Sequence, residues 1–190
     1  MSENGQNVLG MVRQMQKLYG EIGAFMKHFE MVIAKKSLKP ISNSTSVIKD
    51  ISQSLNLPEQ WGPMWMYRLY QGNIKHELVS LNIALDCPDY QDRITEPLAL
   101  FSIVSGKKAN IKHEWYPWDI YFSFRPLQKQ NNRVYSLKDF DLKNIDGINE
   151  LVWEKGDLEA IEELRFISVP LMEIEGEQDI LNKIVNPILN

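Results

Sequence analysis

The 190-residue chain has little of several residue types that would narrow its chemistry. A single cysteine, Cys87, means that no disulfide can form within the chain and that no multi-cysteine zinc site is possible. The first ten residues lack a basic stretch followed by an apolar core, and no window approaches the roughly 18 apolar residues of a membrane span. We therefore expect a cytoplasmic protein with no secretory signal and no membrane-spanning segment.

Sequence signatures of known catalytic centres are also lacking. There is no Walker-type glycine loop, no GxGxxG, no nucleophile elbow and no HExxH. Cys87 lies in "ALDCPD" with no candidate base nearby, which favours a structural role over a nucleophilic one. We expect no cofactor, and a non-enzymatic protein is favoured over an enzyme.

Charge is distributed unevenly along the chain. Residues 1–136 hold 16 basic and 12 acidic residues, a net charge of +4, whereas residues 137–190 hold 5 and 13, a net charge of −8. The lysine pairs at 35–36 and 107–108 are short and far apart, unlike the concentrated basic face of a nucleic-acid-binding protein. Nucleic acid is therefore an unlikely partner. The asymmetry fits a solvated acidic surface, or pairing of the two regions within or between chains.

The longest regular pattern covers residues 7–36. With Val8 at heptad position a, every a, d and e position over four heptads is apolar: Val8, Met15, Ile22 and Phe29 at a, Met11, Leu18, Phe25 and Val32 at d, and Val12, Tyr19, Met26 and Ile33 at e. This stripe predicts an amphipathic helix about 45 Å long. The helix could cover its own sheet, or it could also pair with a second copy in a homodimer. Its length supports the second alternative, because a small sheet rarely covers so long a helix.

The remaining pattern predicts an α+β fold in a single domain, 1–190. Spacing predicts a short helix near 44–56, and alternation predicts a hairpin of strands near 64–71 and 75–86 around the turn signal "QGN". Further strands are expected in "PLALFSIVSGKK" (central), "WDIYFSF", "NRVYSL" and "LRFISVPLMEI", where Pro170 indicates an edge strand or a bulge. We thus expect the long helix on a mostly antiparallel five- or six-stranded sheet within 61–135, and an acidic helix/strand/helix part at 137–190.

The pentapeptide "NIKHE" occurs at 73–77 and again at 110–114. Adjacent strand residues point to opposite faces, so His and Glu of one copy cannot reach the same ion. If the two strands pair in register, His76 and His113 could form a metal site with a carboxylate such as Asp86 or Asp119. We favour the simpler interpretation, in which each copy is a solvated strand entrance.

Aromatic residues cluster in "WGPMWMYRLY" and "HEWYPWDIYFSF". Alternation sets Met66, Arg68 and Tyr70 on one face of the first strand, and Asp119, Tyr121 and Arg125 on one face of a later strand. Tyrosine and arginine combine flat apolar area with directed hydrogen bonds, and arginine holds carboxylates or phosphates with paired donors. These faces could lie beneath the long helix, or they could bind a protein or a small anionic ligand. The candidate ligand-binding residues are Arg68, Tyr70, Trp115, Tyr121 and Arg125.

Three classes of function follow. The leading one is a cytoplasmic interaction or regulatory module that self-associates through the 7–36 helix and presents the aromatic and arginine face. The second is a metal-dependent hydrolase or nuclease, built on His76, His113 and Asp119 or on an acidic loop. That loop would supply Asp86, Asp89, Asp92 and Glu96, with Lys112 nearby. The third is a small-molecule sensor with an aromatic pocket.

Overall fold

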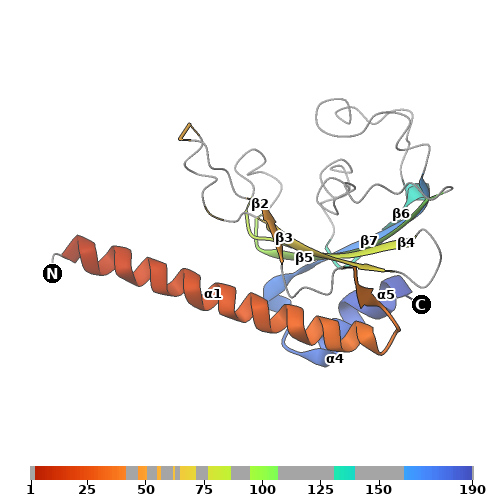
Figure 1. Cartoon of the computed structure of the whole chain (residues 1–190), viewed down its shortest axis with the longest axis horizontal. Coiled ribbons are helices and arrows are strands. Elements are labelled where there is room, and N and C mark those ends of the chain that lie inside the picture. The colour runs from red at the N-terminus through yellow and green to blue at the C-terminus, as the bar shows by residue number, and fades with distance from the viewer. Residues whose placement is uncertain are drawn as a thin grey trace.

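The computed structural model describes residues 3–41, 47–50, 55–56, 62, 65–71, 77–86, 95–106, 131–139 and 161–189. A long helix, α1 (Glu3–Ala34), and a helical C-terminal segment lie on one face of an antiparallel sheet. Figure 1 shows both helical parts on the same side of the strands. The α+β prediction, with a long N-terminal helix packed on an antiparallel sheet, is confirmed.

Seven strands of the described residues form the sheet. They are β1 (Lys39–Pro40), β2 (Ile48–Asp50), β3 (Trp65–Gln71), β4 (Glu77–Ala84), β5 (Leu98–Gly106), β6 (Val134–Ser136) and β7 (Ile161–Pro170). Their spatial order is β1-β3-β4-β5-β7-β6, and β2 also pairs with β3, so β1 and β2 share one edge. Every pairing is antiparallel. The sheet is therefore six strands wide, and β5 is central as the apolar run predicts.

One face of the sheet forms the core with the helices. Its central strands present Val79, Leu81 and Ile83 from β4, Ala99, Phe101 and Ile103 from β5, and Ile167 and Val169 from β7. All are nearly inaccessible to solvent. Alternate residues along a strand point to the same side, which places these residues on one face, and their burial against the helices contributes to the stability of the sheet.

Helix α1 ends in a hydrogen-bonded turn that directs the chain back to the sheet. The Leu38 amide donates to the Ile33 carbonyl (3.3 Å) and the Ser37 amide to the Ala34 carbonyl (3.0 Å). Ser37 adopts φ 65°, a left-handed conformation that glycine usually supplies, and Leu38 is buried. This is a Schellman motif, and it leads directly into β1.

The C-terminal helical segment consists of η6 (Leu171–Glu173), then α4 (Glu177–Asp179), η7 (Ile180–Val185) and α5 (Asn186–Leu189), which run on without a break. The middle stretch, η7, has π-helical hydrogen bonding. Ile180, Ile184, Val185 and Ile188 are buried against the core. The expected closing helix carrying Ile180, Leu181, Ile184 and Val185 is thus confirmed.

Two local predictions are wrong. The helix expected near 44–56 is not formed at Ile48–Asp50, which pair with Trp65–Tyr67 as strand β2, because pairing with an exposed sheet edge outweighs a short helical spacing. Of the two alternatives given for the strand with Pro170, the edge position is wrong, since β7 lies between β5 and β6; a register shift does occur in its pairing with β5, at Ile161–Glu163 and not at Pro170. The Leu171 amide donates to the carbonyl of Pro97, just before β5, so the missing N–H of Pro170 falls on the other side, beyond the last β6 partner, Ile167.

The other face of the sheet combines small polar and aromatic side chains. The hydroxyl oxygens of Ser80 and Ser102 lie 2.6 Å apart. Trp65 stacks on Tyr67 at one side, with ring centroids 5.3 Å apart. Tyr135 stacks on Phe166 at the other side, with centroids 5.4 Å apart. The reverse face thus combines this hydroxyl pair and these aromatic pairs with buried aliphatic side chains, which include Leu78, Leu100 and Leu164.

Candidate association surface

The apolar stripe of α1 divides into two parts with different surroundings. From Ile22 onward its residues are buried, except the half-buried Phe25: Ile22, Met26, Phe29, Val32 and Ile33. Toward the N-terminus the same stripe is open, and Val8, Met11, Val12 and Met15 are between 45% and 57% exposed. Figure 1 shows why, because the first half of α1 extends past the sheet and the C-terminal helix. We call residues 8–15 the projecting stripe.

A groove lies beside α1 where the projecting stripe ends. It encloses about 620 Å³ and is walled by α1 on one side and by residues 171–176 on the other. Its α1 wall includes Gln14, Leu18, Glu21, Phe25 and His28. These positions repeat every three or four residues, so they form one line along the helix. At 1.5 Å per residue the wall is about 21 Å long, a better match to a second helix than to a small molecule.

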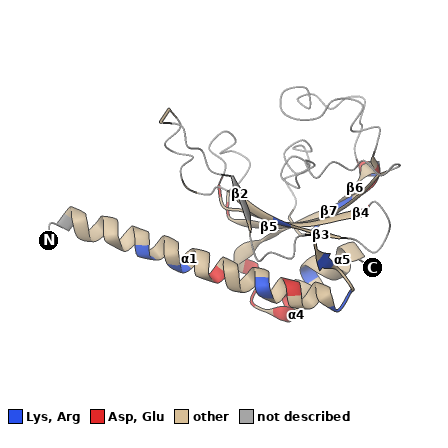
Figure 2. Cartoon of the chain, viewed as in Figure 1, with Lys and Arg blue, Asp and Glu red and all other residues tan. Residues whose placement is uncertain are grey.

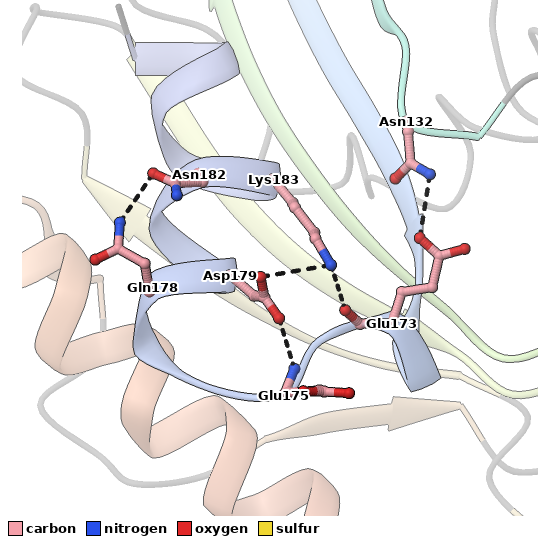
Figure 3. A network of polar contacts seen from close by, with 7 residues as sticks. All are labelled: Asn132, Glu173, Glu175, Gln178, Asp179, Asn182 and Lys183. Atoms are coloured by element: carbon pink, nitrogen blue, oxygen red, sulfur yellow. Dashed lines mark hydrogen bonds and ion pairs between the residues drawn. The ribbon is translucent and has the colours of Figure 1, made fainter.

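The second wall of the groove is held by a polar network, drawn in Figure 3. The Asp179 carboxylate accepts a hydrogen bond from the Glu175 amide (3.0 Å), and Lys183 Nζ donates to the Glu173 carbonyl (2.6 Å). Lys183 also pairs with Asp179 at 3.4 Å. The hydrogen bond from the Glu175 amide, helped by Lys183, holds the pKa of Asp179 below its usual range. Asn132 Nδ2 ties the network to the turn before β6 by donating to Glu173 (3.3 Å).

Few charges interrupt the projecting half of α1. Arg13 is the only charged residue between positions 4 and 16. In Figure 2 this part of the helix is mostly tan, whereas the C-terminal half of α1 and α4 carry clustered red and blue. Lys35, in the turn just after α1, contacts Glu177 on α4, and this hydrogen bond lowers the pKa of Glu177. This contact joins one basic and one acidic residue of the two regions at the surface, next to the end of α1, where both side chains are more than half exposed.

Two of the predicted ligand-binding residues, Arg68 and Tyr70, lie beneath α1. Arg68 is 7% exposed and its Nε lies 2.5 Å from a Glu30 carboxylate oxygen. The Tyr70 hydroxyl donates to the same oxygen at 3.4 Å. Burial, with the neighbouring Glu30 carboxylate, raises the pKa of Tyr70 well above its usual range. The structure thus supplies a carboxylate to Arg68 from within the chain, on α1.

Of the other predicted site residues, Asp86 and Glu96 are described and exposed, and the rest lie outside the described ranges. These are Trp115, Tyr121 and Arg125 of the ligand-binding prediction, His76, His113 and Asp119 of the metal prediction, and Asp89, Asp92, Lys112 and Cys87. Both "NIKHE" copies fall there too, except that Glu77 begins β4. Within the described ranges, no group of three or more His, Cys, Asp or Glu side chains is placed to hold a metal ion. None of the helices described there is both long and apolar enough to cross a membrane.

The reverse face of the sheet contains one buried amide of note. Asn82, at the centre of β4, is fully buried, and neither its Nδ2 nor its Oδ1 has a hydrogen-bond partner among the residues that the structure describes. It pairs in register with Tyr67 and Leu100. Burying a side-chain amide without hydrogen-bond partners lowers the stability of the fold. Asn82 differs in this respect from the neighbouring hydroxyls of Ser80 and Ser102, which bond to each other.

The sequence indicated the stripe but not the groove. One wall of the groove is formed by residues 171–176, which are over 140 positions from the α1 residues that they face. Their sequence, "LMEIEG", contains no motif that predicts this contact. The exposure of Met172, at 70%, is visible only in three dimensions. Comparisons with models of protein families, with curated proteins and with solved structures gave no match to this chain.

Proposed function

We propose that this protein is a cytoplasmic interaction module that self-associates through the projecting half of α1. One observation carries the proposal: the apolar stripe continues for two helical turns beyond the core that buries its C-terminal half. Exposed apolar side chains in a contiguous row are costly to leave in water, and such rows are typical of interaction surfaces. The single cysteine is consistent with a reducing compartment.

The occupant of this surface is a second copy of the chain. A helix that binds an anionic membrane surface usually carries many basic residues on its polar face. Here Asn4, Gln6, Asn7, Gln14 and Gln16 occupy most of the polar positions and Arg13 is the only cation of the segment. Two copies can therefore approach with little electrostatic repulsion, and the apolar stripe of each copy has the same spacing as that of the other.

Sedimentation velocity and native mass spectrometry of the whole chain test the proposal. We expect a dimer for the natural sequence, and a dissociation constant raised about 100-fold or more by Met11→Asp, because association would bury an unpaired carboxylate. The matched control is Gln6→Asp, which places the same charge on the opposite face of the same half of α1 and should leave the dimer intact. A natural chain that remains monomeric at the highest concentration reached would refute self-association.

The proposal also keeps the aromatic and arginine face as a contact for a protein or a small anionic ligand. Arg68 and Tyr70 supply a guanidinium and a phenol next to a shallow groove lined by Lys27, Lys39 and Glu30. For a ligand to reach Arg68, its anion must displace Glu30, so binding would be coupled to movement of α1. Titration of small carboxylates while monitoring tryptophan fluorescence tests this part, and Arg68→Gln should abolish any response.

A further inference from the structure

We infer that the two copies pair with their α1 helices antiparallel, so that the projecting stripe of each copy lies in the groove of the other. The inference rests on the proposed self-association and specifies its geometry. Three observations support it: the spacing of apolar residues along α1, the charges of the two surfaces, and the fixed second wall of the groove.

The spacing comes from one line of residues on α1. Met11, Leu18 and Phe25 follow one another at intervals of seven. Met11 belongs to the projecting stripe, whereas Leu18 and Phe25 belong to the wall of the groove. If a second helix runs in the opposite direction with the two-fold axis near Leu18, Met11 of each copy lies opposite Phe25 of the other. The groove of each copy then holds the projecting stripe of the other copy. The dimer is closed, because neither a groove nor a stripe is left uncovered.

The charges of the two surfaces are compatible with this pairing. The projecting stripe has no charged residue beside it, since Arg13 lies on the opposite face of the helix, whereas the groove carries two carboxylates, Glu21 and Glu175, and one cation, Lys17. Antiparallel pairing about Leu18 also brings Gln14 of one copy beside Glu21 of the other, because both flank the Met11–Leu18–Phe25 line on the same side. In a parallel pair each Gln14 would instead lie beside residues of the same stretch of the other helix, far from Glu21.

The groove is formed before any partner arrives. Its second wall is fixed by the Asp179, Lys183 and Glu173 contacts of Figure 3. Docking into a formed groove requires little ordering of the protein on that side, which favours association. If the two projecting stripes paired only with each other, Leu18, Phe25 and Met172 would stay open to solvent on both copies.

A crosslinking experiment tests the geometry separately from self-association. In a Cys87→Ser background, the double variant Met11→Cys/Phe25→Cys should form disulfide-linked dimers under mild oxidation, and Met11→Cys alone should not. The two positions are about 21 Å apart along one helix, so a disulfide within one chain is impossible. Efficient crosslinking of Met11→Cys alone, in a chain that is dimeric, would show stripe-to-stripe pairing and overturn the antiparallel seating while leaving self-association in place.

An exposed position provides a second test that does not perturb the core. Gln14→Lys should lower the dimer dissociation constant by about 2- to 5-fold and Gln14→Glu should raise it by a similar factor, because each faces Glu21 across the interface. Both effects should shrink at high salt. Equal dissociation constants for the two variants at low salt would contradict the inference. If the natural chain is monomeric, both the proposed self-association and its antiparallel geometry are wrong. If the chain is a dimer but fails the crosslinking test and the charge-variant test, only the antiparallel geometry is wrong.

Discussion

The two halves of α1 share one sequence pattern and differ in what surrounds it. The C-terminal half contributes Phe29, Val32 and Ile33 to the core, whereas the N-terminal half leaves Met11 and Met15 in solvent. Heptad periodicity specifies which side of a helix is apolar, but it does not specify whether that side meets the same chain or another one. Packing within the chain accounts for the C-terminal half of the stripe, and the N-terminal half is the part that the proposed self-association would bury.

The largest effect is expected when side chains are shortened to alanine at two heptad a positions of α1, one in each half of the helix. Phe29 is fully buried and its ring lies 5.2 Å from Phe101 and 5.8 Å from Tyr70, so Phe29→Ala should lower the free energy of unfolding by about 4 kcal/mol. Met15→Ala should change it by less than about 0.5 kcal/mol in the monomer. Chemical denaturation at low protein concentration measures both changes in the free energy of unfolding. Equal losses for the two variants would show that the two halves of α1 do not differ in their contribution to the core.

The next test removes the ion pair that holds the buried half of α1 to the sheet. Glu30→Gln leaves the nearly buried Arg68 without its carboxylate partner on α1, so stability should fall by about 2–3 kcal/mol. Lys27→Gln, an exposed neutralisation on the same helix, should cost little. The effect should also persist at high salt, because a buried pair is weakly screened. If Glu30→Gln lowers the stability no more than Lys27→Gln does, apolar contacts alone hold α1 on the sheet.

A pH experiment addresses the same contact through Tyr70. Its pKa is raised in the folded protein, while an unfolded tyrosine ionises near its ordinary value of 10.0. The unfolded chain therefore loses a proton that the folded chain keeps, and stability should fall as the pH rises above that value. Tyr70→Phe should flatten this part of the stability curve. Denaturation curves at a series of alkaline pH values measure the slope, and an unchanged slope would assign the sensitivity to other groups.

The smallest effect is expected where α1 ends. Ser37 occupies a left-handed conformation that disfavours any side chain, so Ser37→Gly should raise the free energy of unfolding by about 0.5–1 kcal/mol. Thermal denaturation with a Ser2→Gly control, outside the motif, can resolve this difference. A destabilised Ser37→Gly variant would mean that the serine side chain contributes more than its backbone strain removes.

The elements with the strongest periodicity were predictable from the sequence. The α1 stripe, the β3–β4 hairpin and the central β5 all show uninterrupted apolar patterns, and the structure confirms them. Ile48 and its neighbours were mistaken for a helix, since three residues cannot distinguish a helical period from a strand that pairs with a distant edge. The position of a strand within a sheet depends on such distant partners, which is why Pro170 could not distinguish an edge strand from an inner strand such as β7.

The candidate surface was predictable only in part, for the same reason. The stripe is local information, and sequence reasoning identified it. The carboxylate beside Arg68 comes from Glu30, which lies 38 positions earlier on a helix whose rotation over the sheet no local pattern specifies. The groove wall at residues 171–176 is still more remote. Sequence reasoning therefore gave a face with the right chemistry for an anion, without showing that the chain itself supplies one.

The one-sided anchoring of α1 has a mechanical consequence. The helix is fixed to the sheet from Ile22 to the Schellman turn, and its N-terminal half has no other support among the described residues. It therefore behaves as a lever whose fulcrum lies near Ile22. A rotation of about 5° at the fulcrum moves Val8 by about 2 Å, given a rise of 1.5 Å per residue. Small rearrangements beneath the helix, including any at Arg68, are thus amplified at its free end.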